Sequence, residues 1–250
     1  MCESSYNCRL LTYPEGQHVT IYRRSINKGE KNAHLSKTFQ RTGKQDFEQE
    51  EQHCKNVSLS RTKNTIYNIA RSNVWEWFIT LTFNRELTDS ASYDEVTAKL
   101  NDFLANLRKR RCPGLKYLIV PELHKDGIHY HFHGLLSNTD GLQFRFSDHY
   151  DKNGNPIFNV VNWSFGFTTA TRVTDTSRVS SYITKYVTKA TEQYLKEKRR
   201  YYASRNIERA KGEYYIIDEE EFQEIYRDDI QYVKTVNIPV AHQQVTYYEI

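Results

Sequence analysis

The sequence lacks the features that mark secreted, membrane-spanning and nucleotide-hydrolysing proteins. No apolar run approaches the roughly 20 residues that a membrane-spanning helix needs. The first thirty residues contain no apolar core of a signal peptide. No G-x-x-x-x-G-K-[ST] phosphate-binding loop occurs. We therefore expect a cytoplasmic protein without a membrane partner and without an ATP-driven motor of its own.

Cysteine is also scarce, and the four cysteines do not form a recognisable pattern. Cys2, Cys8, Cys54 and Cys112 include no CxxC pair. His53 beside Cys54 offers zinc ligands together with the first two cysteines, but this irregular spacing does not fit the structural zinc patterns. A reduced compartment with free thiols follows.

The charge is nearly balanced, so it does not by itself indicate a nucleic-acid partner. The net charge is +4, while 38% hydrophobic residues supply enough apolar material for a core. Basic residues gather locally at Leu107–Arg111 (LRKRR) and Lys196–Arg200 (KEKRR), and acidic residues at Asp218–Glu224. A solvated helix face explains either basic run equally well.

Between residues 60 and 191, alternating and helical patterns succeed one another, and these predict most of the elements. The expected helices are Ser60–Arg71, Asp94–Arg110 and Ser177–Thr191, and the expected strands are Trp75–Phe83, Lys116–Leu123, Ile128–Leu136 and one or two within Phe158–Val173. This order predicts an α+β fold in which helices pack on an antiparallel sheet.

The flanking segments give weaker signals. Residues 1–59 are polar and irregular, with one short strand expected at His18–Arg23. Glu192–Ile250 predicts a basic helix followed by acidic and tyrosine-rich segments. We therefore expect an N-terminal extension (1–59), a catalytic domain (60–195) and a C-terminal extension (196–250).

Three histidines stand two residues apart in the predicted strand Ile128–Leu136. His129, His131 and His133 then point to one face, because side chains alternate along a strand. Glu122 ends the preceding strand, so hairpin pairing across the turn brings it beside them. Two imidazoles and a carboxylate form a natural site for a divalent ion. The alternative is an exposed hairpin that is merely rich in histidine.

Two tyrosines and two lysines form the second group. Tyr182, Lys185, Tyr186 and Lys189 are spaced i, i+3, i+4 and i+7, so in a helix they share one face. A phenol with its ordinary pKa of about 10 is a weak nucleophile. A nearby ammonium lowers that pKa and attracts phosphate. The alternative is an amphipathic helix with tyrosine and lysine packed on its surface.

These groups occur in an order that resembles a known family. Phe78–Phe83 (FITLTF), His131–His133 (HFH) and Tyr182–Lys189 (YITKYVTK) resemble the three motifs of the HUH endonucleases. They look most like the rolling-circle replication initiators of small single-stranded DNA phages and plasmids. The resemblance covers Trp75 to Lys189 and implies an RRM-like or ferredoxin-like fold.

The resemblance also implies a metal site and a reaction. His131, His133 and Glu122 would hold Mg²⁺ or Mn²⁺, with His129 as an additional ligand. Tyr182 or Tyr186 would attack the scissile phosphate of a single-stranded DNA origin, which leaves a 5′-phosphotyrosine and a free 3′-OH.

Further roles follow from the same resemblance. Lys185 and Lys189 would stabilise the phenolate, and DNA contacts are expected from Arg108, Arg110, Arg111 and Arg172. Without a phosphate-binding loop, the protein would depend on a helicase and a DNA polymerase of its bacterial host.

Three other functions remain open at this point. One is another HUH branch, a relaxase or a single-strand transposase, although relaxases generally place the tyrosine before the histidines. A second is a non-catalytic module that binds single-stranded nucleic acid. A third is a metal-dependent hydrolase without a covalent intermediate, which would still cut DNA after both Tyr182 and Tyr186 are changed to phenylalanine.

Overall fold

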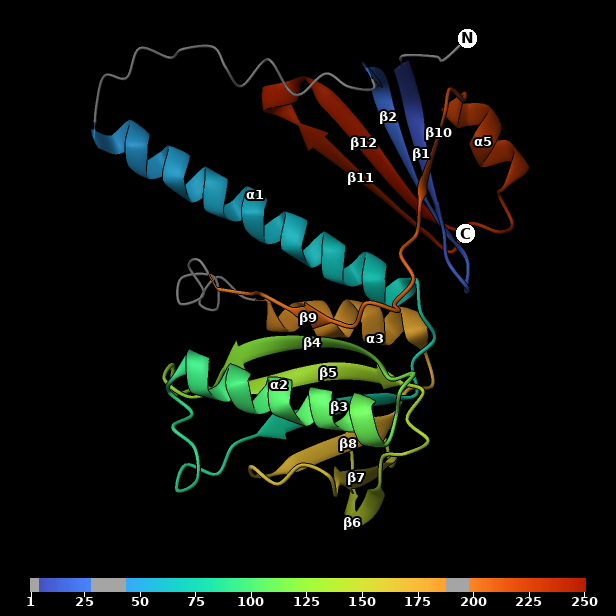
Figure 1. The fold of residues 1–250 in the computed structure, drawn as a ribbon. Coiled ribbons are helices and arrows are strands. Elements are labelled where there is room, and N and C mark those ends of the chain that lie inside the picture. The colour runs from blue at the N-terminus through green and yellow to red at the C-terminus, as the bar shows by residue number, and fades with distance from the viewer. Residues whose placement is uncertain (1–4, 28–43, 188–197) are drawn as a thin grey trace. The chain divides into compact units, whose positions relative to one another are not determined.

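A computed structural model describes residues 5–27, 44–187 and 198–250 and divides the chain into two compact units (Figure 1). The central unit is Gln49–Arg209, and the terminal unit combines Met1–Glu48 with Ala210–Ile250. Whether residues 60–195 suffice for activity stays a prediction. None of the described helices combines the length and the apolar character needed to cross a bilayer.

The central unit is built on a seven-stranded antiparallel sheet in the order β6-β7-β8-β3-β5-β4-β9. The strands are β3 (Trp77–Thr82), β4 (Lys116–Leu123), β5 (Tyr130–Ser137), β6 (Phe144–Tyr150), β7 (Pro156–Val160), β8 (Thr168–Arg172) and β9 (Tyr202–Ala203). The expected strands are confirmed, whereas β6 and β9 were not expected. Strand β9 replaces part of the basic helix that the sequence predicted after Glu192.

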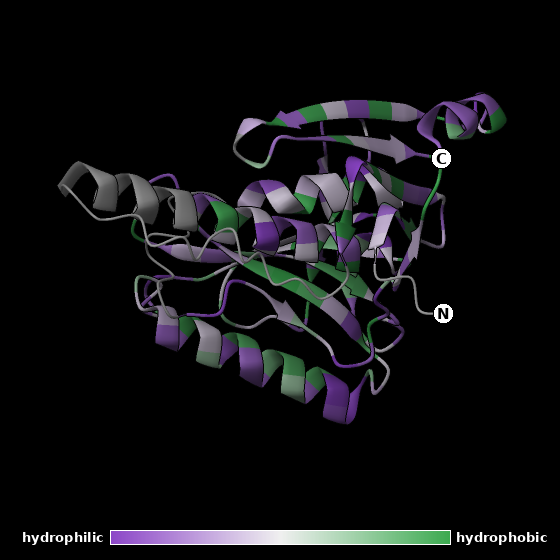
Figure 2. Cartoon of the chain, turned by 90° about the horizontal axis from the view of Figure 1, so that it is seen from above, coloured by the Kyte–Doolittle hydropathy of each residue, from purple (hydrophilic) through white to green (hydrophobic). Residues whose placement is uncertain are grey.

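Helices cover both faces of this sheet rather than the one face expected, while the α+β class is confirmed. Helix α2 (Tyr93–Arg110) buries an apolar stripe against one face, where Val96 and Leu100 meet Ile79 and Leu81. Its first turn is capped by Ser92, whose side chain accepts a hydrogen bond from the backbone N–H of Glu95. Figure 2 shows the mixture of apolar and polar residues along the helices that one-sided burial requires.

The opposite face is covered by α1 (Lys44–Arg71) and α3 (Thr176–Ile183). Ile66 and Ile69 of α1 and Ile183 of α3 share a core with Leu118 and Leu135 of the sheet. Because neighbouring residues of a strand point to opposite faces, β4 and β5 contribute to both cores. Both strands are therefore firmly held, which matters for the side chains they present at their ends.

The predicted helix Ser177–Thr191 is shorter than expected. Helix α3 ends at Ile183 and is followed by a 3₁₀ turn, η2 (Thr184–Tyr186). At Val187 the backbone leaves the helical region, with φ −87° and ψ 83°. Ile183, Thr184 and Val187 are β-branched, and such residues lose side-chain freedom in a helix. Residues 188–191, including Lys189, lie outside the described residues.

The terminal unit is a five-stranded antiparallel sheet in the order β10-β1-β2-β12-β11. Its elements are β1 (Ser5–Thr12), β2 (Gln17–Asn27), β10 (Gly212–Tyr215), α5 (Glu219–Ile225), β11 (Tyr232–Ile238), η3 (Pro239–Ala241) and β12 (Gln243–Glu249). Strand β2 contains the predicted His18–Arg23 and pairs with β12 from the other end of the chain. The N-terminal segment is therefore a structural partner of the C-terminal one, which corrects the expectation of an irregular tail.

Candidate active site

Hairpin pairing between β4 and β5 sets the backbone of the site. Glu122 lies opposite His131, and Val120 lies opposite His133. On the other side of β5, Thr80 of β3 also lies opposite His133. The turn between β4 and β5 contains Gly127 with φ +70°, a conformation that glycine adopts without strain. A carboxylate and two imidazoles thus meet where three neighbouring strands hold them.

The three side chains converge on one point, and we call them the His/Glu group. The Nε2 atoms of His131 and His133 each lie 2.9 Å from Oε2 of Glu122 and 2.8 Å from each other. All three ligand atoms lie within 4.8 Å of one another. The side chains are 12%, 9% and 24% exposed for His131, His133 and Glu122. Two imidazoles and one carboxylate at this spacing match the ligand set of a divalent ion.

The second nitrogen of each imidazole supports this arrangement. Nδ1 of His133 lies 3.1 Å from the hydroxyl of Thr80, so a proton on Nδ1 leaves the Nε2 lone pair free for a ligand. Nδ1 of His131 is buried and has no hydrogen-bond partner among the described residues. A buried imidazole that makes its polar contacts only through Nε2 is directed toward the group's centre. The residues present therefore fit a divalent ion.

The pKa values favour the ligand forms of these groups. Burial raises the pKa of Glu122, but hydrogen bonds with His131 and His133 outweigh it and lower that pKa to about 2. Burial lowers the pKa of His133, and the neighbouring His131 lowers it further, against the opposing effect of Glu122. A charged carboxylate and a neutral imidazole are the species that bind metal.

Both tyrosines lie beside the His/Glu group. The ring of Tyr186 stacks on His133, with centroids 3.5 Å apart and planes 16° apart. Tyr182 meets Tyr186 edge-on at 5.4 Å. Phe78 of β3 contacts both phenol rings, at 5.3 Å and 6.1 Å between centroids, and His133 at 5.9 Å. The structure thus brings together the histidine and tyrosine motifs, which are about fifty residues apart in sequence.

The two phenols differ in their surroundings. Tyr182 is 42% exposed, whereas Tyr186 is half-buried. Burial, a hydrogen bond with Tyr182 and the negative charge of Glu122 raise the pKa of Tyr186. Lys185 places its Nζ 5.1 Å from the ring centroid of Tyr182, so one of the two expected lysines lies beside a phenol. The roles of these residues stay predictions.

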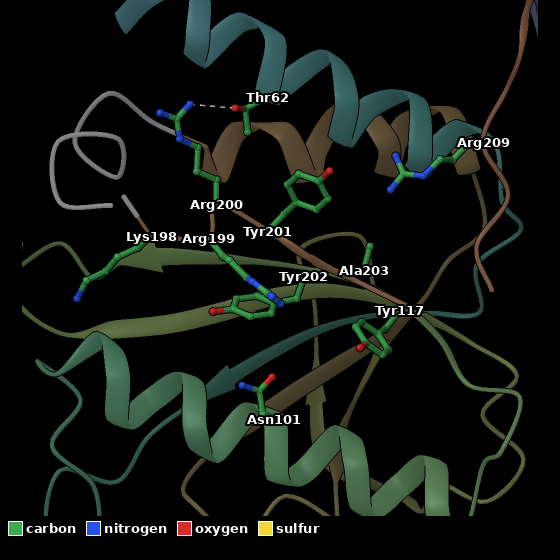
Figure 3. A pocket seen from close by; sticks show the side chains of 10 residues that line it. All are labelled: Thr62, Asn101, Tyr117, Lys198, Arg199, Arg200, Tyr201, Tyr202, Ala203 and Arg209. Carbon is green, nitrogen blue, oxygen red and sulfur yellow. Dashed lines mark hydrogen bonds between the residues drawn. The ribbon is translucent and has the colours of Figure 1, made fainter. Parts of the chain in front are cut away.

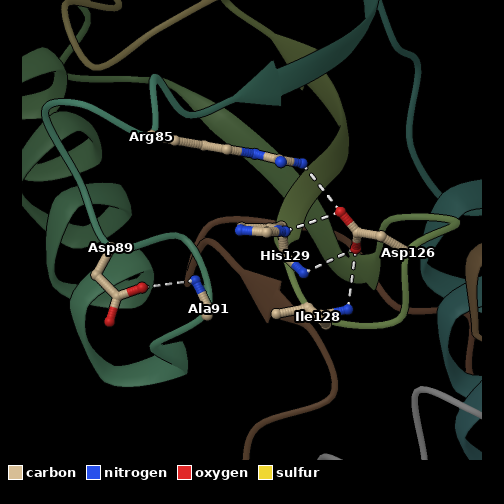
Figure 4. Close-up of polar contacts among 6 residues, drawn as sticks. All are labelled: Arg85, Asp89, Ala91, Asp126, Ile128 and His129. Atoms are coloured by element: carbon tan, nitrogen blue, oxygen red, sulfur yellow. Dashed lines mark hydrogen bonds and ion pairs between the residues drawn. The ribbon is translucent and has the colours of Figure 1, made fainter.

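His129 lies outside the His/Glu group. Strand β5 begins at Tyr130, so the expectation that three histidines lie in one strand is wrong for the first of them. Nδ1 of His129 lies 2.8 Å from Asp126, whose carboxylate also accepts hydrogen bonds from the backbone N–H groups of Ile128 and His129 and from Arg85 (Figure 4). The turn residue Asp126 takes up the imidazole because its carboxylate closes the hairpin loop.

The sequence analysis missed Asp126 and Thr80. Asp126 stands in a turn sequence, HKDG, where an aspartate is expected to bond its own backbone. Backbone hydrogen bonds from Ile128 and His129 hold its pKa below the ordinary value. Thr80 lies within FITLTF, and strand alternation could have placed its hydroxyl on the histidine face once the pairing of β3 with β5 was known.

The four arginines expected to contact DNA lie in two places. Arg108, Arg110 and Arg111 are exposed at the end of α2, where positive charge also suits the helix dipole. Arg172 lies in β8 with its guanidinium 3.9 Å from the ring centroid of Trp77. A structural role accounts for each of these positions, and their binding of DNA stays a prediction.

Comparison with known proteins agrees with this site. Residues 76–191 match a family model of replication-associated proteins of the ORF2 type. The matched region contains β3, the His/Glu group and both tyrosines. No curated protein and no solved structure matches the chain. The match supports a family of replication initiators and, with it, a role in DNA replication.

Proposed function

We propose that this protein is a rolling-circle replication initiator of the HUH type, which nicks and rejoins one DNA strand through a tyrosine. The observation that carries the proposal is the stacking of Tyr186 on His133, 3.5 Å between ring centroids, within a His/Glu group. A metal-binding imidazole in contact with a phenol puts a nucleophile where a phosphate would be bound.

Each side chain has a distinct task in this proposal. Bound Mg²⁺ or Mn²⁺ would polarise the scissile phosphate and offset charge that develops on it. His131, His133 and Glu122 would hold the ion. Thr80 would keep the ring of His133 in the orientation that directs Nε2 inward. Phe78 would hold both phenols against this surface through its ring contacts.

The proposed step is an in-line displacement at phosphorus. The phenolic oxygen of Tyr182 or Tyr186 forms a bond to phosphorus as the bond from phosphorus to the 3′-oxygen breaks. The phenol gives up one proton and the departing 3′-oxygen takes one up, so atoms and charges balance. The products are a 5′-phosphotyrosine and a free 3′-OH, and the reverse attack rejoins the strand. Lys185, and Lys189 outside the described residues, would stabilise the phenolate.

The partners of this activity are a single-stranded or extruded DNA origin, a host helicase and a host DNA polymerase. The scissile phosphate must reach half-buried ligands, and a base-paired strand does not present a phosphate in that way. The free 3′-OH is the primer that a polymerase extends. A separate helicase is needed because the chain carries no phosphate-binding loop for ATP.

A denaturing gel tests the proposal directly. The full chain is incubated with Mn²⁺ and a pool of labelled single-stranded oligonucleotides, because the origin sequence is unknown. We expect a covalent protein–DNA adduct that is lost in His131→Ala and in the Tyr182→Phe/Tyr186→Phe double variant. His149→Ala, on the exposed strand β6, is the control and should form the adduct as the unaltered chain does.

Three other outcomes would contradict the proposal in different ways. DNA cleavage that persists in the double tyrosine variant would point to a metal-dependent hydrolase. Binding without cleavage at any Mn²⁺ concentration would point to a binding module. An adduct that persists in His131→Ala would separate the chemistry from the His/Glu group.

A further inference from the structure

A basic cavity lies at the β9 edge of the seven-stranded sheet, separate from the His/Glu group. Its volume is about 510 Å³, and four cations border it: Lys198, Arg199, Arg200 and Arg209 (Figure 3). None of the described residues that line it carries a carboxylate. A concentration of positive charge in a cavity creates a potential that favours an anionic ligand.

Arg200 is held in place by helix α1. Its Nη1 donates to the hydroxyl of Ser58 at 2.8 Å and to the hydroxyl of Thr62 at 3.0 Å. Figure 3 shows the bond to Thr62 at the upper rim of the cavity. A guanidinium whose position is fixed loses less conformational entropy when it binds a ligand. The cavity is therefore partly preorganised.

The other cations are exposed and available to a ligand. Arg199 and Arg209 are both exposed, and the guanidinium carbon of Arg199 lies 6.0 Å from the ring centroid of Tyr202. Lys198 lies 3.7 Å from Asp94, whose side chain is 88% exposed. Such a solvent-exposed pair is worth little, so Lys198 can exchange this partner for a stronger anion.

Aromatic and amide groups lie between these cations. Tyr117, Tyr201, Tyr202 and Asn101 line the same cavity. Cations that follow a phosphate backbone, together with aromatic rings on which bases stack, are typical of surfaces that bind single-stranded nucleic acid. A site for a free anion needs the cations but has no use for the rings.

The cavity is connected to the His/Glu group through two structural routes. Tyr202 of β9 pairs with Ile119 of β4, and Glu122 follows three residues later, roughly 10 Å along a strand that rises ~3.3 Å per residue. In addition, Tyr93 donates its hydroxyl proton to the carbonyl oxygen of Arg199 and contacts Tyr130, the residue before His131. The segment that carries the cations is thus tied to the strand that carries the ligands.

We propose that the basic cavity binds backbone phosphates of the same single DNA strand whose scissile phosphate is held at the His/Glu group. This inference rests on the proposed function, because it takes its ligand from that activity. The cavity acts on binding rather than on the chemical step. Loss of its cations therefore raises the DNA concentration needed for half-maximal cleavage and leaves the rate at saturating DNA unchanged.

Fluorescence anisotropy with a labelled single-stranded oligonucleotide tests the cavity. We compare the full chain with Arg199→Gln/Arg209→Gln, which changes two exposed residues and spares the bonds of Arg200 to α1. The matched control, Arg145→Gln/Lys152→Gln, removes the same charge from the exposed β6–β7 hairpin. The cavity variant should bind at least about 10-fold more weakly. Its salt slope should fall by about 1.4, given a slope of roughly 0.7 per phosphate of a single strand.

Several results would overturn the inference. Equal weakening in both variants would mean that overall charge, not the cavity, governs binding. Unchanged binding in the cavity variant would remove the site altogether. A larger loss with a duplex of the same sequence would assign the cavity to double-stranded DNA, and displacement of the probe by millimolar inorganic phosphate would make it a free-anion site.

The two proposals fail in distinguishable ways. If the unaltered chain forms no adduct but the cavity variant still loses single-strand binding, the nuclease is wrong and the DNA site stands. If the adduct forms normally and the cavity variant binds DNA as the unaltered chain does, the cavity inference is wrong and the nuclease stands.

Discussion

The two units of this chain use antiparallel sheets for different ends. In the central unit, β4 and β5 place a carboxylate and two imidazoles at one point, so the sheet presents charged groups to a ligand. In the terminal unit, the corresponding interior is closed: Cys8, Ile21 and Tyr248 are at most 3% exposed and pack with Phe222 of α5. The comparison teaches that the same pairing geometry serves a site where polar side chains converge, and serves stability where apolar ones do.

A divalent ion should separate the two units most strongly. A ligand that binds only the folded state stabilises it by about 2.7 kcal/mol when its concentration is 100 times its Kd. We expect Mn²⁺ to increase the protection of amide hydrogens in β4 and β5 by this amount and to leave those in β1 and β2 unchanged. Hydrogen exchange with mass spectrometry measures both units in one sample.

Glu122→Gln provides the control for that experiment. It keeps the size of the side chain and removes the charge that the ion requires, so the increase in β4 and β5 should disappear. Equal protection of β1 and β2 by Mn²⁺ would break the comparison, because it would place an ion-dependent element in the terminal unit as well.

The hydroxyl of Thr80 should have the next largest effect. Thr80→Val keeps a β-branched side chain in β3 but removes the partner of Nδ1 of His133. Loss of a group that orients a metal-binding histidine typically weakens metal binding by about 10- to 100-fold. Titration with Mn²⁺ by calorimetry measures this loss. Thr80→Ser retains the hydroxyl and should bind within a few-fold of the unaltered chain, and an equal loss in both variants would assign the effect to packing.

The sequence predicted the central unit far better than the terminal one, for a physical reason. The ligands His131 and His133 are neighbours on one strand, and Glu122 is joined to them by a short turn, so local pattern and pairing rules sufficed. The packing of Tyr186 on His133 depended on two motifs with strong local character. Even so, the helix containing Tyr182 was expected to run to Thr191, because propensity alone does not fix where a helix ends.

The five-stranded sheet offered no comparable local signal. Val19 of β2 pairs with Tyr248 of β12, so the pattern of either strand has meaning only beside a partner from the other end of the chain. Similarly, β9 has only two residues and is defined by its pairing with Leu118 and Ile119. Elements that depend on distant pairing carry little of their information in their own sequence.

Alkaline pH should produce the smallest effect, and in the terminal unit. Burial, and then a hydrogen bond to Glu219, raises the pKa of Tyr248 to about 12 from an ordinary value near 10. Because the folded-state pKa is the higher one, the stabilisation is complete below pH 10 and is lost as the pH rises toward 12. We expect a loss on the order of 1 kcal/mol, since one pKa unit corresponds to about 1.4 kcal/mol and solvent reduces the effect.

Chemical denaturation at a series of pH values measures this loss, with hydrogen exchange reporting each unit separately. Burial also raises the pKa of Cys8 to about 11 from an ordinary value near 9, so part of the decline should begin at pH 9. Tyr248→Phe has no proton to lose and should show a shallower decline between pH 10 and 12, whereas Tyr247→Phe, the neighbour on the opposite face of β12, should decline as the unaltered chain does. If Tyr248→Phe declines just as steeply, the closed interior of the terminal unit is not what alkaline pH opens, and the contrast with the ligand-presenting sheet loses its physical basis.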